Sequence, residues 1–99
     1  MTMTQSQNRI IGKFLNFIQS QGGPLSNWYV GVSEDARRRL FIEHGVEPTD
    51  PHIIEIADNV KEAREVETFF INKGMDGAPG GGDDTNMVYA YKKMPHTKP

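Results

Sequence analysis

One carboxylate, Glu67, stands inside an otherwise apolar helical stripe. It lies four residues after Ala63 and three before Phe70, so a helix of 3.6 residues per turn places all three on one face. Burial of a lone carboxylate costs free energy unless a cation or a metal ion meets it. Glu67 is therefore an edge position in a salt bridge, a metal ligand, or the partner of a buried arginine. The apolar members of the stripe are Ala63, Val66, Phe70 and Ile71.

Three consecutive arginines, Arg37, Arg38 and Arg39, follow an acidic turn. Successive helical positions turn by about 100°, so the three side chains cannot all face one ligand. Arg39 precedes Glu43 by four residues, which favours a surface ion pair worth about 0.5 kcal/mol or less. The planar guanidinium group also suits the oxygens of a phosphate, which is the functional alternative.

Two tyrosines and a histidine offer further chemistry. Tyr29 and Tyr89 each fall in a predicted strand, where tyrosines usually pack in the core or across strand pairs. A positioned tyrosine can also relay a proton. His44 ends the arginine helix, where a histidine often caps carbonyl groups. Each of the three therefore has a structural interpretation beside the chemical one.

The segment 74–86, GMDGAPGGGDDTN, is a glycine-rich loop. It lacks the G-K-[ST] ending of a phosphate-binding P-loop, it does not open a helix, and its spacing is not that of an EF-hand. The default interpretation is a flexible connector. The alternative is that its glycines let backbone N–H groups approach a ligand and that its aspartates, Asp76, Asp83 and Asp84, bind a cation.

Six predicted elements must position these residues. Hydrophobic periodicity gives the order α-β-α-β-α-β, and Asn59 with Glu62 forms a capping box for the third helix. The pattern predicts a small α/β (α+β) domain with a few-stranded sheet flanked by helices. We expect residues 1–99 to form a single domain that ends in a flexible tail, 94–99. The elements are helix 5–20, strand 28–32, helix 35–44, strand 52–57, helix 60–73 and strand 87–93.

The first predicted helix carries more apolar surface than a minimal domain needs. We expect this surface to pack on the sheet of the same chain or on a second copy, which would make a homo-oligomer through this helix. Its apolar residues are Ile10, Ile11, Phe14, Leu15, Phe17 and Ile18.

Composition and charge narrow the class of protein. No stretch approaches the roughly 18 apolar residues of a membrane span, the N-terminus does not resemble a secretion signal, and the chain has no cysteine for disulfides or thiolate metal sites. We therefore expect a cytoplasmic protein without a membrane partner. The net charge of −2 and the pI near 5.9 oppose a wide, non-specific DNA-binding surface. They suit a small nucleotide or a restricted nucleic-acid contact.

Residues of about 27–73 resemble the GIY-YIG nuclease family. Tyr29-Val30-Gly31 looks like the second strand motif of that family. The following VSEDARRRLFIEH resembles its turn and helix, with Arg39 at the position of the catalytic arginine and His44 where some members carry histidine. EIADNVKEAREVETFFINKG is similar to the strand and helix in which an alanine, here Ala63, is followed four residues later by a metal-binding glutamate, here Glu67.

Two features depart from the family pattern. The Gly-Ile-Tyr strand belongs about ten residues before Tyr29, where this chain has QGGPLSN. The segment MVYAY, residues 87–91, reads like that strand moved to the C-terminus, and pairing beside strand 28–32 would place Tyr89 near Tyr29. The family often has an asparagine after the glutamate helix, for which Asn72 and Asn86 are the candidates.

The resemblance implies metal-dependent phosphodiester hydrolysis on nucleic acid or a nucleotide. In the family a strand tyrosine acts on the attacking water, the arginine holds the phosphate, and the glutamate binds one divalent metal, here Mg²⁺ or Mn²⁺. Two alternatives remain open, a non-catalytic protein that binds a nucleotide or nucleotide signal on the same fold, and a protein-interaction module. The residues so assigned are Tyr29, Arg39, Tyr89 and His44 as catalytic, Gly31, Arg37 and Arg38 as substrate-binding, and Glu67 as the metal ligand.

Overall fold

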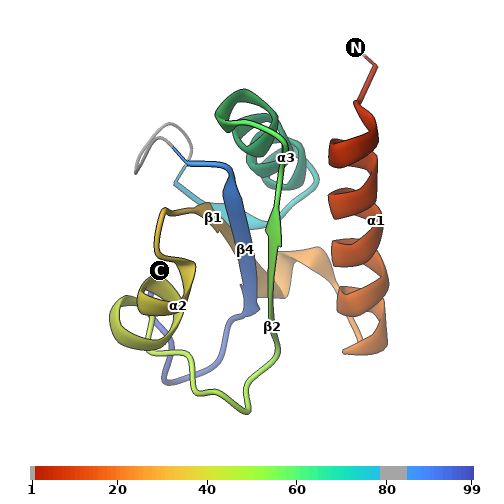
Figure 1. Cartoon of the computed structure of the whole chain (residues 1–99). Coiled ribbons are helices and arrows are strands. Elements are labelled where there is room, and N and C mark those ends of the chain that lie inside the picture. The colour runs from red at the N-terminus through yellow and green to blue at the C-terminus, as the bar shows by residue number, and fades with distance from the viewer. Residues whose placement is uncertain (1, 79–84) are drawn as a thin grey trace.

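The chain is a small mixed α+β domain in the computed structural model, which describes residues 2–78 and 85–99 (Figure 1). Periodicity placed the first helix and the first strand at their observed bounds, and the predicted strands 52–57 and 87–93 and helix 60–73 each end one residue earlier than expected. The elements are α1 (Gln5–Ser20), the short 3₁₀ turn η1 (Leu25–Asn27), β1 (Trp28–Val32), α2 (Ala36–Arg38), the π-helical turn η2 (Arg39–Glu43), β2 (His52–Ile56), α3 (Val60–Asn72), β3 (Asp76–Gly77) and β4 (Met87–Lys92).

The last strand of the chain lies inside the sheet, not at its edge. The strand order is β2-β4-β1-β3, with β4 antiparallel to both β2 and β1, and with the short β3 parallel to β1. The predicted pairing of segment 87–91 beside strand 28–32 is therefore confirmed. In the observed register Tyr89 lies opposite Gly31 and Tyr91 lies opposite Tyr29.

The two faces of the sheet are covered by different elements. Side chains alternate between the faces along a strand, so Trp28 and Val30 of β1 join the main core with α1 and α3. Tyr29 points to the other face, where it packs in a second cluster with Leu40 of η2 and Val46. Figure 1 shows α1 and α3 on one side of the sheet and α2 on the other. The face of the sheet that carries Tyr29 is therefore the one that α2 and η2 cover.

Helix α1 packs its apolar stripe on its own chain. Thr4 and Gln7 form a capping box that starts the helix, and Phe14 stacks on Phe70 of α3 with 5.5 Å between ring centroids. All six apolar residues that distinguish the first predicted helix belong to the main core or pack against it. Of the two expected locations for this apolar surface, on the same chain or on a second copy, the structure shows the first. In the part of the chain that the structure describes, no helix is both long and apolar enough to cross a membrane.

Two segments differ from the sequence-based expectation. Residues 35–44 do not form one α-helix. Three α-helical residues, capped by the side chain of Asp35, lead into the π-turn η2, which closes when the backbone N–H of His44 donates to the carbonyl of Arg39 at 2.7 Å. Segment 74–86 is not entirely loop, because Asp76–Gly77 pairs with β1 as β3. The loop aspartates Asp83 and Asp84 lie outside the described residues.

Candidate functional site

A small pocket brings together residues from four elements, among them Tyr29 and Tyr89 from one face of the sheet and Glu67 from α3, which covers the other face. Its volume is about 80 Å³. Five of the eight residues assigned from the resemblance line it, and they come from β1, η2, α3 and β4. We call it the tyrosine pocket, and its lining residues are Tyr29, Gly31, Val32, Arg39, Glu67, Ala78 and Tyr89.

Glu67 reaches this pocket from α3, the helix that otherwise packs in the main core. The residue is only 3% exposed, and within residues 2–78 and 85–99 its carboxylate makes no hydrogen bond or ion pair. Burial raises the pKa of Glu67 above its ordinary value, and the charge of Arg64 opposes that effect in part. A salt bridge therefore does not explain this carboxylate, and a cation bound in the pocket would offset the cost of its burial.

Tyr89 is held between the pocket and His44. The hydroxyl of Tyr89 lies 2.7 Å from Nε2 of His44, and both residues are buried. Burial raises the pKa of Tyr89 far above its ordinary value, the neighbouring Tyr29 adds to the effect, and Arg39 opposes it. Burial also lowers the pKa of His44, with Arg39 contributing in the same direction, while a hydrogen bond to the Lys98 carbonyl opposes the change. At neutral pH the pair therefore consists of a neutral phenol and a neutral imidazole.

The glycine opposite Tyr89 makes room for its ring. A Cβ at Gly31 would lie 2.5 Å from Cζ of Tyr89 and would overlap the hydroxyl group. Any side chain at position 31 would therefore displace Tyr89 from His44. This is the physical reason for glycine in the Tyr29-Val30-Gly31 sequence of β1.

Tyr29 lines the pocket as part of an aromatic group. Its ring centroid lies 4.8 Å from that of His44 and 5.2 Å from that of Tyr91, with which it is stacked. Burial raises the pKa of Tyr29, and the carboxylates of Asp76 and Glu67 raise it further. Tyr29 is therefore a protonated phenol whose ring is held in place by its two neighbours.

Arg39 lies between its ion-pair partner and the tyrosine pocket. Its Nε lies 3.2 Å from Oε1 of Glu43, the predicted ion pair at i and i+4, and the same side chain lines the tyrosine pocket. Arg37 and Arg38 are exposed and do not line that pocket. Arg37 instead borders a separate cavity of about 600 Å³ beside Arg9. Only one of the three arginines therefore reaches the tyrosine pocket, in agreement with the expectation that the three cannot all face one ligand.

The sequence did not identify two further contributors to the site. Tyr91 follows Tyr89 by two residues in β4, so strand periodicity alone would have placed it on the same face. The segment 94–99, for which we expected a flexible tail, forms neither helix nor strand, and it is hydrogen-bonded to the body of the protein. The carbonyl of Lys98 lies 2.7 Å from Nδ1 of His44 and accepts from the Tyr91 hydroxyl at 2.9 Å.

The other candidates have structural explanations. Asn86 donates its side-chain amide to the carbonyl of Ala57 at 2.8 Å, and neither it nor Asn72 lines the tyrosine pocket. A second group of metal-ligand type consists of Glu47, Asp50 and His96, whose ligand atoms lie within 4.8 Å of one another. There the His96 and Asp50 side chains form an ion pair at 2.5 Å, which accounts for the arrangement without a metal.

Comparisons of the chain with protein-family models, with curated proteins and with solved structures give no match.

Proposed function

We propose that this protein hydrolyses phosphodiester bonds in nucleic acid or a nucleotide, with Mg²⁺ or Mn²⁺, in the tyrosine pocket. One observation carries the proposal. Tyr29, Gly31, Arg39, Glu67 and Tyr89 come from four separate elements, and all of them line one pocket. Each of the five has a functional role in the resemblance to the GIY-YIG family.

The residues present fit a divalent metal. Glu67 is a buried carboxylate with a raised pKa and no ion pair within the described part of the chain. Mg²⁺ is typically held by one or two carboxylates together with waters and substrate phosphates, so a single glutamate suffices as the protein ligand. A bound divalent ion would supply charge neutralisation at the leaving oxygen.

Arg39 is placed to hold the phosphate. Its guanidinium is oriented by Glu43 on one side and faces the pocket on the other. A planar guanidinium can bind two phosphoryl oxygens at once, and a fixed cation stabilises the charge that develops on them in the transition state. The ion pair with Glu43 therefore orients Arg39 and leaves it in the lining of the pocket.

Tyr89 and His44 are placed to move the proton of the attacking water. A phenol with a raised pKa is not a resident base, so Tyr89 acts as a relay. As the water oxygen bonds to phosphorus, one water proton passes to the Tyr89 oxygen, and the proton of Tyr89 passes to Nε2 of His44, 2.7 Å away. The phosphorus–oxygen ester bond breaks, and the departing oxygen takes a proton from solvent.

A second candidate function is recognition of a phosphate group without hydrolysis. The observation that favours it is the protonation of Tyr29, because a neutral phenol donates a hydrogen bond to a phosphate oxygen. This alternative predicts a ligand that stabilises the fold and is recovered intact.

One experiment separates the two functions. Wild-type protein is incubated with single-stranded, duplex and branched DNA, RNA and cyclic nucleotides, with Mg²⁺, with Mn²⁺ and with a chelator. Products are resolved by electrophoresis or chromatography, and melting temperatures are measured in parallel. Metal-dependent products that Glu67→Gln does not form support hydrolysis. Glu65→Gln, on the same helix and outside the pocket, is the matched control. Stabilisation by a ligand that stays intact would assign the protein to recognition.

A further inference from the structure

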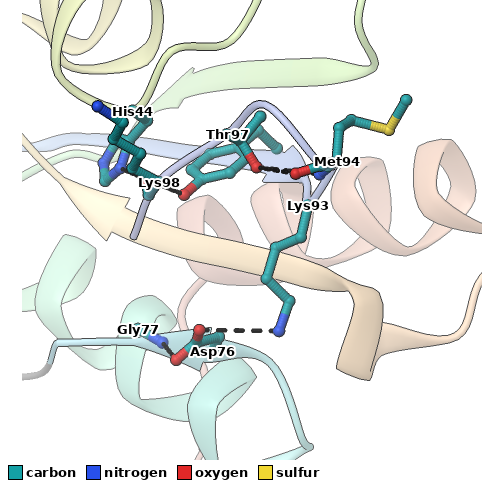
Figure 2. A network of polar contacts seen from close by, with 8 residues as sticks. His44, Asp76, Gly77, Lys93, Met94, Thr97 and Lys98 are labelled. Atoms are coloured by element: carbon teal, nitrogen blue, oxygen red, sulfur yellow. Dashed lines mark hydrogen bonds and ion pairs between the residues drawn. The ribbon is translucent and has the colours of Figure 1, made fainter.

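The segment 94–99 contacts His44 on the side of its ring opposite Tyr89. The backbone of Lys98 makes two hydrogen bonds with His44, because its N–H donates to the His44 carbonyl at 2.7 Å and its own carbonyl lies 2.7 Å from Nδ1 of the ring. Figure 2 shows Lys98 beside His44, with Met94 and Thr97 in the turn that precedes it. The chain thus returns to the site after β4 has already crossed it.

Several contacts hold this segment in place. The N–H of Thr97 donates to the Met94 carbonyl at 3.0 Å, and the N–H of Met94 donates to Oγ1 of Thr97 at 2.9 Å. Gly45 has φ of 71°, and a Cβ there would lie 3.0 Å from the carbonyl oxygen of His96. The segment therefore passes directly over Gly45, where a side chain would crowd it.

Nδ1 of His44 has two polar neighbours among the described residues, the carbonyl of Lys98 at 2.7 Å and the hydroxyl of Tyr91 at 3.2 Å. A backbone carbonyl only accepts hydrogen bonds, so Nδ1 must be the donor in this contact. The pKa of His44 is lowered by burial, so the neutral ring has no second proton for Nε2. Nε2 then presents its lone pair to Tyr89, whose hydroxyl donates to it at 2.7 Å.

We propose that the Lys98 carbonyl is a positioning group that holds His44 as the Nδ1–H tautomer and so makes Nε2 the proton acceptor for Tyr89. The catalytic part of this inference rests on the proposed hydrolysis, whereas the tautomer does not. When Nε2 takes the proton of Tyr89, the ring becomes an imidazolium. Its Nδ1–H remains bonded to the carbonyl, and this bond strengthens because its donor is now charged.

The reverse arrangement would block the relay. With the proton on Nε2, His44 would donate to the Tyr89 oxygen and could not accept from it. The Lys98 carbonyl would face an unprotonated Nδ1, and the Tyr91 hydroxyl, 3.2 Å from that nitrogen, would have to give up its 2.9 Å bond to the same carbonyl in order to donate to the ring. The hydrogen bond made by one ring nitrogen commonly sets the state of the other. The C-terminal segment therefore contributes to the site through its backbone, which explains why no side-chain motif in residues 94–99 revealed it.

The test is nitrogen-15 NMR of the histidine rings in the full chain. We expect His44 to show a protonated Nδ1 and an unprotonated Nε2, although free neutral imidazole side chains favour the opposite form in water. An Nε2–H tautomer in the folded wild type would overturn the inference, and this readout needs no substrate.

Two substitutions at one position complete the test. Lys98→Pro removes the N–H that donates to His44 and displaces the carbonyl, whereas Lys98→Ala keeps both backbone groups. We expect the proline variant to lose the Nδ1–H tautomer and the alanine variant to keep it. An unchanged tautomer in the proline variant would overturn the positioning role.

With a cleaved substrate from the panel, kcat should be lower in Lys98→Pro than in Lys98→Ala at equal KM. A lost tautomer with equal kcat would contradict the catalytic part of the inference. If wild-type protein cleaves nothing in the panel, the proposed hydrolysis fails, while the tautomer result still stands or falls on its own.

Discussion

Replacement of Glu67 by glutamine separates the loss of stability that a buried carboxylate causes from its proposed role as a metal ligand. The variant keeps the shape of the side chain and removes its charge. Glu67 is 3% exposed and its pKa is raised by burial above the ordinary 4.5. A carboxylate whose pKa is higher in the folded state binds its proton more tightly there, so stability falls as pH rises from about 4.5 through the folded pKa. At pH 7 and without metal, we therefore expect Glu67→Gln to melt at a higher temperature than wild type.

Metal should reverse this order. A ligand that binds only the folded state at a free concentration 100 times its Kd adds about 2.7 kcal/mol of stability. For a chain of 99 residues, each kcal/mol corresponds to roughly 4–8 °C. Saturating Mg²⁺ or Mn²⁺ should therefore raise the melting temperature of wild type by roughly 10–20 °C. It should leave Glu67→Gln nearly unchanged, because Glu67 supplies the only carboxylate among the described residues that line the pocket.

The assay is thermal unfolding followed by circular dichroism at pH 7, with metal and with a chelator. Glu65→Gln is the control, because it changes the same residue type on the same helix. Two results would refute the reasoning. One is a Glu67→Gln variant that is less stable than wild type in the chelator, and the other is a variant that retains the full metal-dependent increment.

Three further predictions follow from the geometry of the pocket. Gly31→Ala should lose about 1–3 kcal/mol of stability by overpacking and most of its activity, because the new methyl group displaces Tyr89; chemical denaturation and a crystal structure of the variant would check this, and an unmoved Tyr89 ring would contradict it. Arg39→Lys should lower kcat about a hundredfold or more, because lysine cannot hold two phosphoryl oxygens as a fixed guanidinium does. Glu43→Gln removes an exposed ion pair and should change the free energy of unfolding by less than about 1 kcal/mol. Steady-state kinetics and unfolding check both variants, and equal effects of the two substitutions would contradict the reasoning. The lowered pKa of His44 means that the unfolded chain binds this proton more readily, so stability should fall as pH drops below about 6.5 and level off above it; His44→Gln should flatten that slope in a pH series of melting temperatures, and an equally steep slope in the variant would count against a buried neutral imidazole.

Much of the fold could be predicted because local signals and tertiary packing agree in this chain. The apolar spacing of α1, its Thr4–Gln7 capping box and the break after Ser20 all place the helix where it is found. Asn59 caps α3 through its side chain, as the sequence indicated. The position of Glu67 inside an apolar stripe identified a buried carboxylate, and the structure leaves that carboxylate without an ion pair among the described residues.

The parts that could not be predicted depend on non-local contacts. The π-turn η2 spaces its hydrogen bond one residue wider than an α-helix does, from His44 back to Arg39. At His44 it meets β4 through Tyr89 and segment 94–99 through Lys98. Strand β3 has only two residues, too few for a periodic signal. The contact of Lys98 with His44 is made by the backbone, so residue types carry no trace of it.

The most direct test of the central claim is a side-by-side cleavage assay of wild type, Tyr89→Phe, Arg39→Ala and Glu67→Gln in Mg²⁺. All four proteins are first shown to be folded, and Glu65→Gln is carried as the control. The proposed mechanism predicts metal-dependent turnover by wild type and the control, and a loss of kcat in each of the three pocket variants. Turnover that survives in the three variants, or folded wild-type protein that binds a phosphate ligand and releases it intact, would contradict hydrolysis in this pocket.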